Sequence, residues 1–248
     1  MPEDERTARA ADLTGSPDAL AVLGEGALEV EGRLPWSSNY TFLVTAQLDG
    51  QEMRAVYKPG RGERRLWDFP PRLYVREVAA FRLSEALGLH VVPETVLRTD
   101  APFGEGSLQR FVDADFSEHY FSLLEDDALH TSLKTIAGFD VLLNNADRKG
   151  GHCLLGPDQR IWAIDHGLCF HPDPKLRTVM WDFAGQAIPD VLLDACGALA
   201  RGGLSDDVGE LLTAGERTAL LRRAKALVTS GSFPEPPPDS RAYPWPLV

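Results

Sequence analysis

Two aspartates stand where their surroundings suit phosphoryl transfer. Asp147 lies in the small, polar stretch 144–152, which follows an apolar helical run, and such loops often carry catalytic groups on a rigid scaffold. Asp165 ends the apolar run 161–164, and a single hairpin separates it from Asp147. One carboxylate can orient or deprotonate an attacking hydroxyl, while the other holds Mg²⁺ against phosphates. Taken alone, each is more readily explained as an ordinary turn residue.

A lysine and a glutamate form a second candidate pair. Lys58 closes the apolar run 55–57, and strand alternation places it on the face of Val56. Glu77 falls in the centre of the apolar stripe of a helix expected over 73–87, where a carboxylate needs a cationic or hydrogen-bonding partner. The nearest preceding strand supplies Lys58. The alternatives are an exposed lysine at a strand end and a glutamate that reaches solvent.

Histidines and cysteines gather in one stretch and could bind zinc. The spacing of these residues is irregular and lacks a paired Cys-x-x-Cys, which argues against a zinc site; they are His152, Cys153, His166, Cys169 and His171.

The elements around these residues indicate an α+β fold in two lobes. Strands are expected over 27–33, 41–47, 52–58, 94–98 and 106–112, with Asp49–Gly50 as a tight turn. Helices are expected over 73–87, 129–143, 189–199 and 214–228, with a hairpin of 153–155 and 161–164 between them. The expected divisions are an extension with a short helix over 1–25, a first lobe over 26–112, a second lobe over 113–230 and a proline-rich, extended tail over 231–248.

The composition excludes several classes of function. The chain has 248 residues and a net charge of −12, which argues against sequence-blind binding to nucleic acid or to anionic membranes. No apolar run is long enough to span a bilayer, so no stable membrane insertion is expected. Three cysteines imply no disulfide framework, which favours a reducing cytoplasmic location.

Taken in order, these stretches resemble the phosphatidylinositol 3-/4-kinase superfamily, and its type II phosphatidylinositol 4-kinases and small actinobacterial members most closely. The resemblance extends from Trp36 to Gln186. Each stretch alone is weak, but the ordered set is specific. The matching stretches are 37–42, 57–59, 76–80, 92–95, 106–112, 145–148 and 163–170.

The resemblance implies a protein-kinase-like fold, with an antiparallel sheet and one helix in the first lobe and a mainly helical second lobe. It also implies ATP as the cofactor. Lys58, held by Glu77, would contact the α and β phosphates, as the lysine of protein kinases does. The implied phosphate loop is Ser37, Ser38 and Asn39, and the implied adenine-binding hinge is Gln109, Phe111 and Val112.

The resemblance further assigns the reacting groups. Asp147 is the implied catalytic aspartate and Asp165 the implied ligand of Mg²⁺ or Mn²⁺. His152 stands where the family has an asparagine as a second metal ligand, although imidazole suits Mg²⁺ poorly. Arg148 or Lys149 would stabilise charge on the transferring phosphoryl group.

The departures from the family leave alternatives open. The segment 60–68 replaces a cysteine-rich insertion of the lipid kinases, and four nearby arginines (61, 64, 65 and 72) suit either a phosphorylated ligand or plain solvent. The expected acceptor is therefore a protein or a small polar molecule.

His152 also favours a second hypothesis, an ATP-binding pseudokinase that acts as a scaffold, with the tail either docking a partner or packing on the body. Transfer of the nucleotide instead of the phosphate is a third.

Overall fold

The computed structural model describes residues 17–35, 39–238 and 241–248. Residues 1–16 of the expected extension, and Ser37 and Ser38 of the expected phosphate loop, lie outside the described residues. The strands are β1 (Ala27–Arg33), β2 (Phe42–Leu48), β3 (Gln51–Pro59), β4 (Thr95–Arg98), β5 (Gly106–Arg110), β6 (Cys153–Leu155) and β7 (Ile161–Ala163). The α-helices are α1 (Pro17–Glu25), α2 (Leu73–Ala86), α3 (Tyr120–Leu123), α4 (His130–Leu143), α5 (Asp190–Gly202), α6 (Asp206–Gly209) and α7 (Ala214–Ser230). The 3-10 helices are η1 (Gly60–Gly62), η2 (Asp127–Leu129), η3 (Gly150–His152) and η4 (Trp181–Phe183).

The chain divides into two compact units, and the α+β class is confirmed. Unit 1 contains the residues up to Val75 together with Glu94–Phe111. Unit 2 contains Arg76–Pro93 and Val112–Val248. Most of α2 therefore groups with unit 2, whereas the sequence places the whole helix in the first lobe. Among the described residues, none of the helices is long and apolar enough to cross a membrane.

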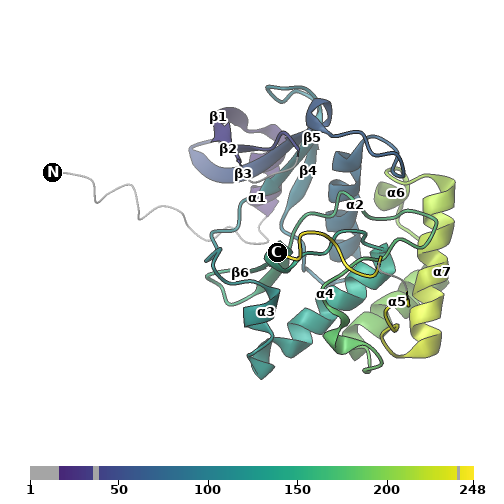
Figure 1. The fold of residues 1–248 in the computed structure, drawn as a ribbon. Coiled ribbons are helices and arrows are strands. Elements are labelled where there is room, and N and C mark those ends of the chain that lie inside the picture. Colours follow the sequence, from purple (N-terminus) through teal and green to yellow (C-terminus); the bar gives the residue numbers. More distant parts are fainter. Residues whose placement is uncertain (1–16, 36–38, 239–240) are drawn as a thin grey trace. The chain divides into compact units, whose positions relative to one another are not determined.

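Unit 1 is a five-stranded antiparallel sheet in the order β1-β2-β3-β5-β4. Asp49 and Gly50, both with positive φ, close the hairpin between β2 and β3, as the Asp-Gly signal predicts. Helix α1 covers one face of the sheet (Figure 1), because its apolar side chains pack on alternate residues of the strands. The resulting core contains Ala19, Val22, Leu23, Val44, Ala46, Met53, Ala55, Tyr57, Ala101 and Leu108.

Lys58 lies on the other face of this sheet. In β3, Ala55 and Tyr57 are buried in the core, while Val56 and Lys58 are only half-buried, so the expected alternation is confirmed. Lys58 pairs with Ser107 in β5. The neighbouring Gly106 is required there, because a Cβ atom would stand 2.4 Å from the carbonyl oxygen of Lys58.

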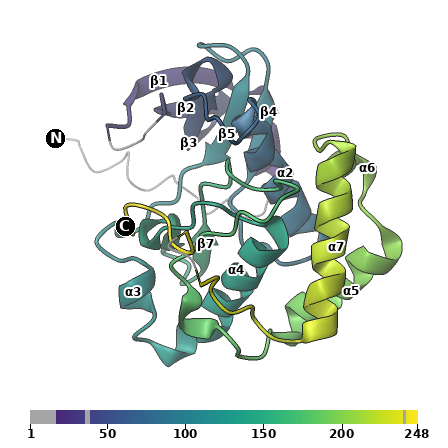
Figure 2. The ribbon, with the colours of Figure 1, turned by 45° about the vertical axis from the view of Figure 1, so that its right-hand side comes forward.

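Unit 2 is mainly helical, with a two-stranded hairpin formed by β6 and β7. Helices α5 and α7 run side by side and α4 packs against both (Figure 2). Gly138 in α4 permits a close approach to α5, since a Cβ atom would collide with Leu192 at 2.1 Å. The core of this unit draws on α2, α4, α5, α7 and the hairpin.

Candidate functional site

The loop that carries Asp147 is fixed by two asparagines at the end of α4. Asn144 adopts a left-handed conformation that ends the helix, and its side-chain amide donates to the carbonyl oxygens of His171 and Asp173. The Asn145 side chain donates to Asp140 in α4 and accepts the backbone N–H of Asp147 at 3.0 Å. Both asparagines are buried. The backbone of Asp147 is therefore held by the helix that precedes it.

Lys149 is the charged partner of Asp147. Its Nζ atom lies 3.0 Å from Oδ2 of Asp147, and the aspartate side chain keeps 26% of its surface exposed. Desolvation raises the pKa of Asp147 above the usual aspartate range, and the charge of Asp165 adds to the rise, while Lys149 opposes it. A carboxylate with a raised pKa and partial exposure is suited to accept a proton from a hydroxyl.

Asp165 follows β7 in a strained backbone conformation. Its φ is 61°, a region that residues other than glycine rarely adopt and that is often found at functional sites. Its Oδ2 atom lies 3.3 Å from Nε2 of His152, and 43% of its side chain is exposed. Nδ1 of the same histidine accepts the backbone N–H of Lys149. A neutral His152 with Nδ1 as an acceptor carries its proton on Nε2, the nitrogen that lies near Asp165.

These contacts decide how well the site suits a divalent cation. The Asp165 carboxylate is an oxygen ligand of the kind that Mg²⁺ prefers, and Mg²⁺ in phosphate-transfer sites commonly has only one or two protein ligands. Among the described residues, no three His, Cys, Asp or Glu side chains gather as a ready metal cage. Nε2 of His152 lies beside the Asp165 carboxylate, so His152 can position Asp165, and its assignment as a second metal ligand stays a prediction.

Glu77 contacts the segment that follows Asp165. Its Oε2 atom accepts the backbone N–H of His166 at 2.9 Å, and Glu77 itself is 3% exposed. A buried carboxylate in the middle of α2 is as the sequence predicts. Lys58 belongs to unit 1 and Glu77 to unit 2, so the expected pairing of the two stays a prediction.

Arg148 does not have the role that the sequence suggested. Its guanidinium is fully buried and makes a bidentate ion pair with Asp140, at 2.6 and 2.9 Å. The remaining donors reach the carbonyl oxygens of His152 and Ile164 and Nε2 of His166. All five N–H donors of the side chain are thus engaged, and none remains for a phosphoryl group. Arg148 positions the loop, and Lys149 is the cation beside Asp147.

Three expected nucleotide-binding residues lie in unit 1. The Asn39 side chain accepts the backbone N–H of Arg64 at 2.9 Å, so it joins two loops of this unit. Gln109 lies in the interior strand β5, with β3 and β4 on either side, so its backbone is part of the sheet and does not present an edge to adenine. Phe111 donates its backbone N–H to the carbonyl of Arg54. The assignment of Gln109 as a residue whose backbone contacts adenine is therefore corrected.

Val112, the last hinge residue, belongs to unit 2. It is buried against Leu154 and Trp162 of the hairpin, and its carbonyl accepts the N–H of Ala114. Its side chain is thus part of a small core.

Among the described residues, the histidine and cysteine stretch brings no three His, Cys, Asp or Glu side chains together around one point. Cys153 and Cys169 are fully buried, and burial raises the pKa of Cys153 to about 12 and that of Cys169 well above its usual value. Zinc is bound by thiolates, so these buried thiols would have to lose their protons before they could act as ligands.

The sequence reasoning missed the buried partners that hold the loop. Asp140 is fully buried in α4 and binds both Arg148 and Asn145. A carboxylate inside an apolar helix is the same signal that revealed Glu77, and it was present here. Arg76, beside Glu77, is also buried, and it binds Glu216 at the start of α7 and the carbonyl of Cys169. No local pattern indicates that pair.

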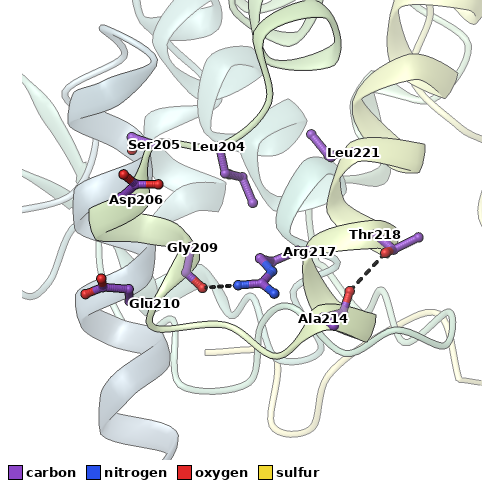
Figure 3. A pocket seen from close by; sticks show the side chains of 9 residues that line it. All are labelled: Leu204, Ser205, Asp206, Gly209, Glu210, Ala214, Arg217, Thr218 and Leu221. Carbon is purple, nitrogen blue, oxygen red and sulfur yellow. Dashed lines mark hydrogen bonds between the residues drawn. The ribbon is translucent and has the colours of Figure 1, made fainter.

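A pocket of about 410 Å³ lies in unit 2 between α6 and the first turns of α7 (Figure 3). Arg217 crosses it to donate to the carbonyl of Gly209, and Asp206 and Glu210 stand at its edge. None of the expected site residues lines it.

The sequence is 40% identical over 271 residues to Protein Rv2133c of Mycobacterium tuberculosis, covering 94% of this chain and 97% of that protein. The structure of hydra Fam20 with sugar is similar in fold, with a TM-score of 0.55 and 13% identity over 84% of this chain and 86% of that one. The Helicobacter pylori proinflammatory kinase CtkA gives a TM-score of 0.47 and 13% identity over 85% of this chain and 94% of that one.

The family comparison covers the loops described above. The sequence model of the phosphatidylinositol 3- and 4-kinase family matches residues 55–195, more than half of the chain, from the strand of Lys58 to α5. Asp147 and Asp165 both fall inside the match. The chain therefore belongs to the phosphatidylinositol 3- and 4-kinase family, and it is a kinase-like protein.

Proposed function

We propose that this chain is an ATP-dependent phosphotransferase that moves the γ-phosphate to a hydroxyl group. The observation that carries the proposal is the pair of partly exposed aspartates at either side of the β6–β7 hairpin, each with a basic side chain in contact. Asp147 has Lys149, and Asp165 has His152. Family membership supports the assignment of these loops to phosphate chemistry.

The nucleotide-binding groups come from the family resemblance. Lys58 is assigned to the α and β phosphates, with Glu77 as the group that orients its ammonium. Backbone N–H groups of Ser37, Ser38 and Asn39 are assigned to the phosphate loop. Phe111 and Val112 are assigned to adenine. The half-buried position of Lys58 on the sheet face away from α1 supports its role.

The reaction requires one proton to leave the acceptor. Asp147 accepts that proton as the hydroxyl oxygen forms a bond to the γ-phosphorus and the bond from this phosphorus to the β–γ bridging oxygen breaks, which leaves ADP. Lys149 lies close enough to Asp147 to stabilise charge on the transferring group. Asp165 is the residue that would hold Mg²⁺ or Mn²⁺, and the bound cation would neutralise charge on the phosphates.

The acceptor is assigned to a protein or a small polar molecule. A net charge of −12 opposes binding to an anionic membrane surface, and the segment 60–68 contains no cysteine for an acyl anchor.

Labelled ATP tests this proposal. The purified chain is incubated with γ-labelled or α-labelled ATP, with Mg²⁺ or Mn²⁺, and with polar acceptors or protein mixtures. Transfer of the γ label only, which disappears in Asp147→Ala, supports the proposal. Transfer of the α label would instead show nucleotide transfer, and the phosphotransfer assignment would be wrong.

The contact between His152 and Asp165 favours a second candidate, an ATP-binding pseudokinase that serves as a scaffold. A histidine beside the aspartate that is assigned to the metal competes with the cation for that carboxylate. This candidate predicts a rise in melting temperature with ATP and no turnover with either metal. The replacement His152→Asn introduces the residue that the family has at this position. A gain of phosphate transfer in this variant would support the phosphotransferase, whereas a scaffold without catalytic activity would show no turnover.

A further inference from the structure

The segment 241–248, which the proposed reaction does not use, lies against the loops of the site. In Figures 1 and 2 it ends at the C-terminus near β6 and β7. Ala242 is 1% exposed, whereas Trp245 is 87% exposed. The segment is therefore anchored at particular residues and not throughout.

The first anchor joins Ala242 to Thr178 and Trp181, close to Arg148. The carbonyl oxygen of Ala242 accepts the backbone N–H of Thr178 at 3.1 Å and Nε1–H of Trp181 at 2.9 Å. Thr178 in turn forms an isolated parallel bridge with Arg148. Thr178 thus lies between two other segments of the chain, with the loop of Arg148 on one side and Ala242 on the other.

The second anchor reaches the catalytic loop directly. The carbonyl oxygen of Leu247 accepts the backbone N–H of Gly150 at 2.7 Å. The methyl groups of Val248 cover the same glycine, since a Cβ atom on Gly150 would stand 3.3 Å from one of them. Phe121 of α3 packs on it from another direction, at 3.2 Å from the same Cβ position. Gly150 follows Lys149, the partner of Asp147, and precedes His152, the partner of Asp165, by two residues.

These contacts hold the loop and leave its reactive group accessible. Both hydrogen-bonding anchors use backbone carbonyls of the segment, and with the segment in place 26% of the Asp147 side chain remains exposed. A segment that blocked the acceptor would cover this carboxylate.

We propose that residues 241–248 are a positioning strap, which holds the backbone at Gly150 and thereby sets Lys149 and His152 against their aspartates. This inference rests on the proposed phosphotransferase function for its effect on rate, but not for its effect on the loop.

The test removes the second anchor and keeps the first. A variant lacking residues 247–248 loses two partly exposed side chains and retains Ala242, so we expect it to keep the fold. The matched control is Trp245→Ala, which changes a large, exposed side chain of the same segment. Amide hydrogen exchange at Gly150 and Thr178 is measured together with kcat and KM for ATP.

The strap predicts that exchange at Gly150 accelerates at least about tenfold in the deletion variant, while exchange at Thr178 stays near the wild-type rate. It also predicts a fall in kcat of about tenfold with little change in KM, because loop geometry and not nucleotide binding is disturbed. Trp245→Ala leaves both measurements unchanged.

Two results would overturn the strap. One is wild-type protection of Gly150 in the deletion variant. The other is faster exchange at Gly150 with an unchanged kcat, which would show that the contact does not position the reacting groups. If the wild-type chain transfers no phosphate, the proposed function fails, and exchange at Gly150 alone decides whether the segment holds the loop.

Discussion

Oε2 of Glu77 accepts a hydrogen bond from the backbone N–H of His166 at 2.9 Å, and both residues are buried. The contact joins the centre of α2 to the residue immediately after Asp165. Burial of the carboxylate is therefore balanced in part by a backbone donor, and Glu77 supports the segment that follows Asp165 whatever its relation to Lys58.

Two replacements of Glu77 separate its charge from this hydrogen bond. Glu77→Ala leaves the buried N–H of His166 without its acceptor and is expected to lower the free energy of unfolding by about 1–3 kcal/mol. Glu77→Gln keeps an oxygen acceptor, so it is expected to cost clearly less in stability while it reduces kcat/KM for ATP. Urea denaturation and steady-state kinetics measure the two effects. Equal destabilisation by both variants would show that the hydrogen bond to His166 is unimportant.

The buried pair of Asp140 and Arg148 predicts strong coupling. Arg148→Met leaves the Asp140 carboxylate buried without its cation, and the expected cost is about 3–5 kcal/mol of unfolding free energy. The double variant Asp140→Leu with Arg148→Met removes both charges. It is expected to cost less than the sum of the single variants, with a coupling energy of at least about 1 kcal/mol. Additive costs in urea denaturation would contradict the pair as the main support of the loop.

The pH dependence of turnover follows from the raised pKa of Asp147. A base must be ionised, so kcat is expected to fall as the pH drops through a pKa above the usual aspartate range. Lys149 lowers that pKa, and Lys149→Met is therefore expected to move the acid limb of the kcat profile to higher pH. Lys225→Met, which changes an exposed lysine of α7, is the control. An unmoved limb, or one displaced to lower pH, would exclude Asp147 as the titrating base.

The three cysteines are expected to resist modification in the folded chain. Burial raises the pKa of Cys153 to about 12 and that of Cys196 to about 11, and thiolates are the reactive form. A thiol reagent at neutral pH is expected to react with all three only after unfolding. A chelator is expected to leave the melting temperature unchanged. A lower melting temperature after chelation would revive the zinc interpretation.

The sequence predicted the local elements well, because each had a strong local signal. Asp49–Gly50 marked its hairpin, alternation placed Lys58 opposite the core of unit 1, and the apolar stripe around Glu77 identified a buried carboxylate. The α+β class and the kinase family were likewise accessible from ordered motifs.

The contacts between distant segments were not accessible. The sequence read Arg148 as a catalytic cation, because nothing near it shows that all its donors are used by Asp140, His166 and two carbonyl groups. The docking of Leu247 on Gly150 has no local signature either, since it uses backbone atoms only. Such partners depend on the folded path of the chain and not on residue type.

The central claim is that Asp147 and Asp165 have different roles in one phosphotransfer site, and calorimetric titration with ATP and Mg²⁺ tests it most directly. Asp147→Asn removes the base and a desolvated charge, so we expect wild-type ATP affinity, an undiminished melting temperature and no turnover. Asp165→Asn removes the cation ligand, so we expect the Mg²⁺-dependent part of the affinity to fall at least about tenfold. Mg²⁺-dependent ATP binding that survives unchanged in Asp165→Asn, or turnover that survives in Asp147→Asn, would contradict the account.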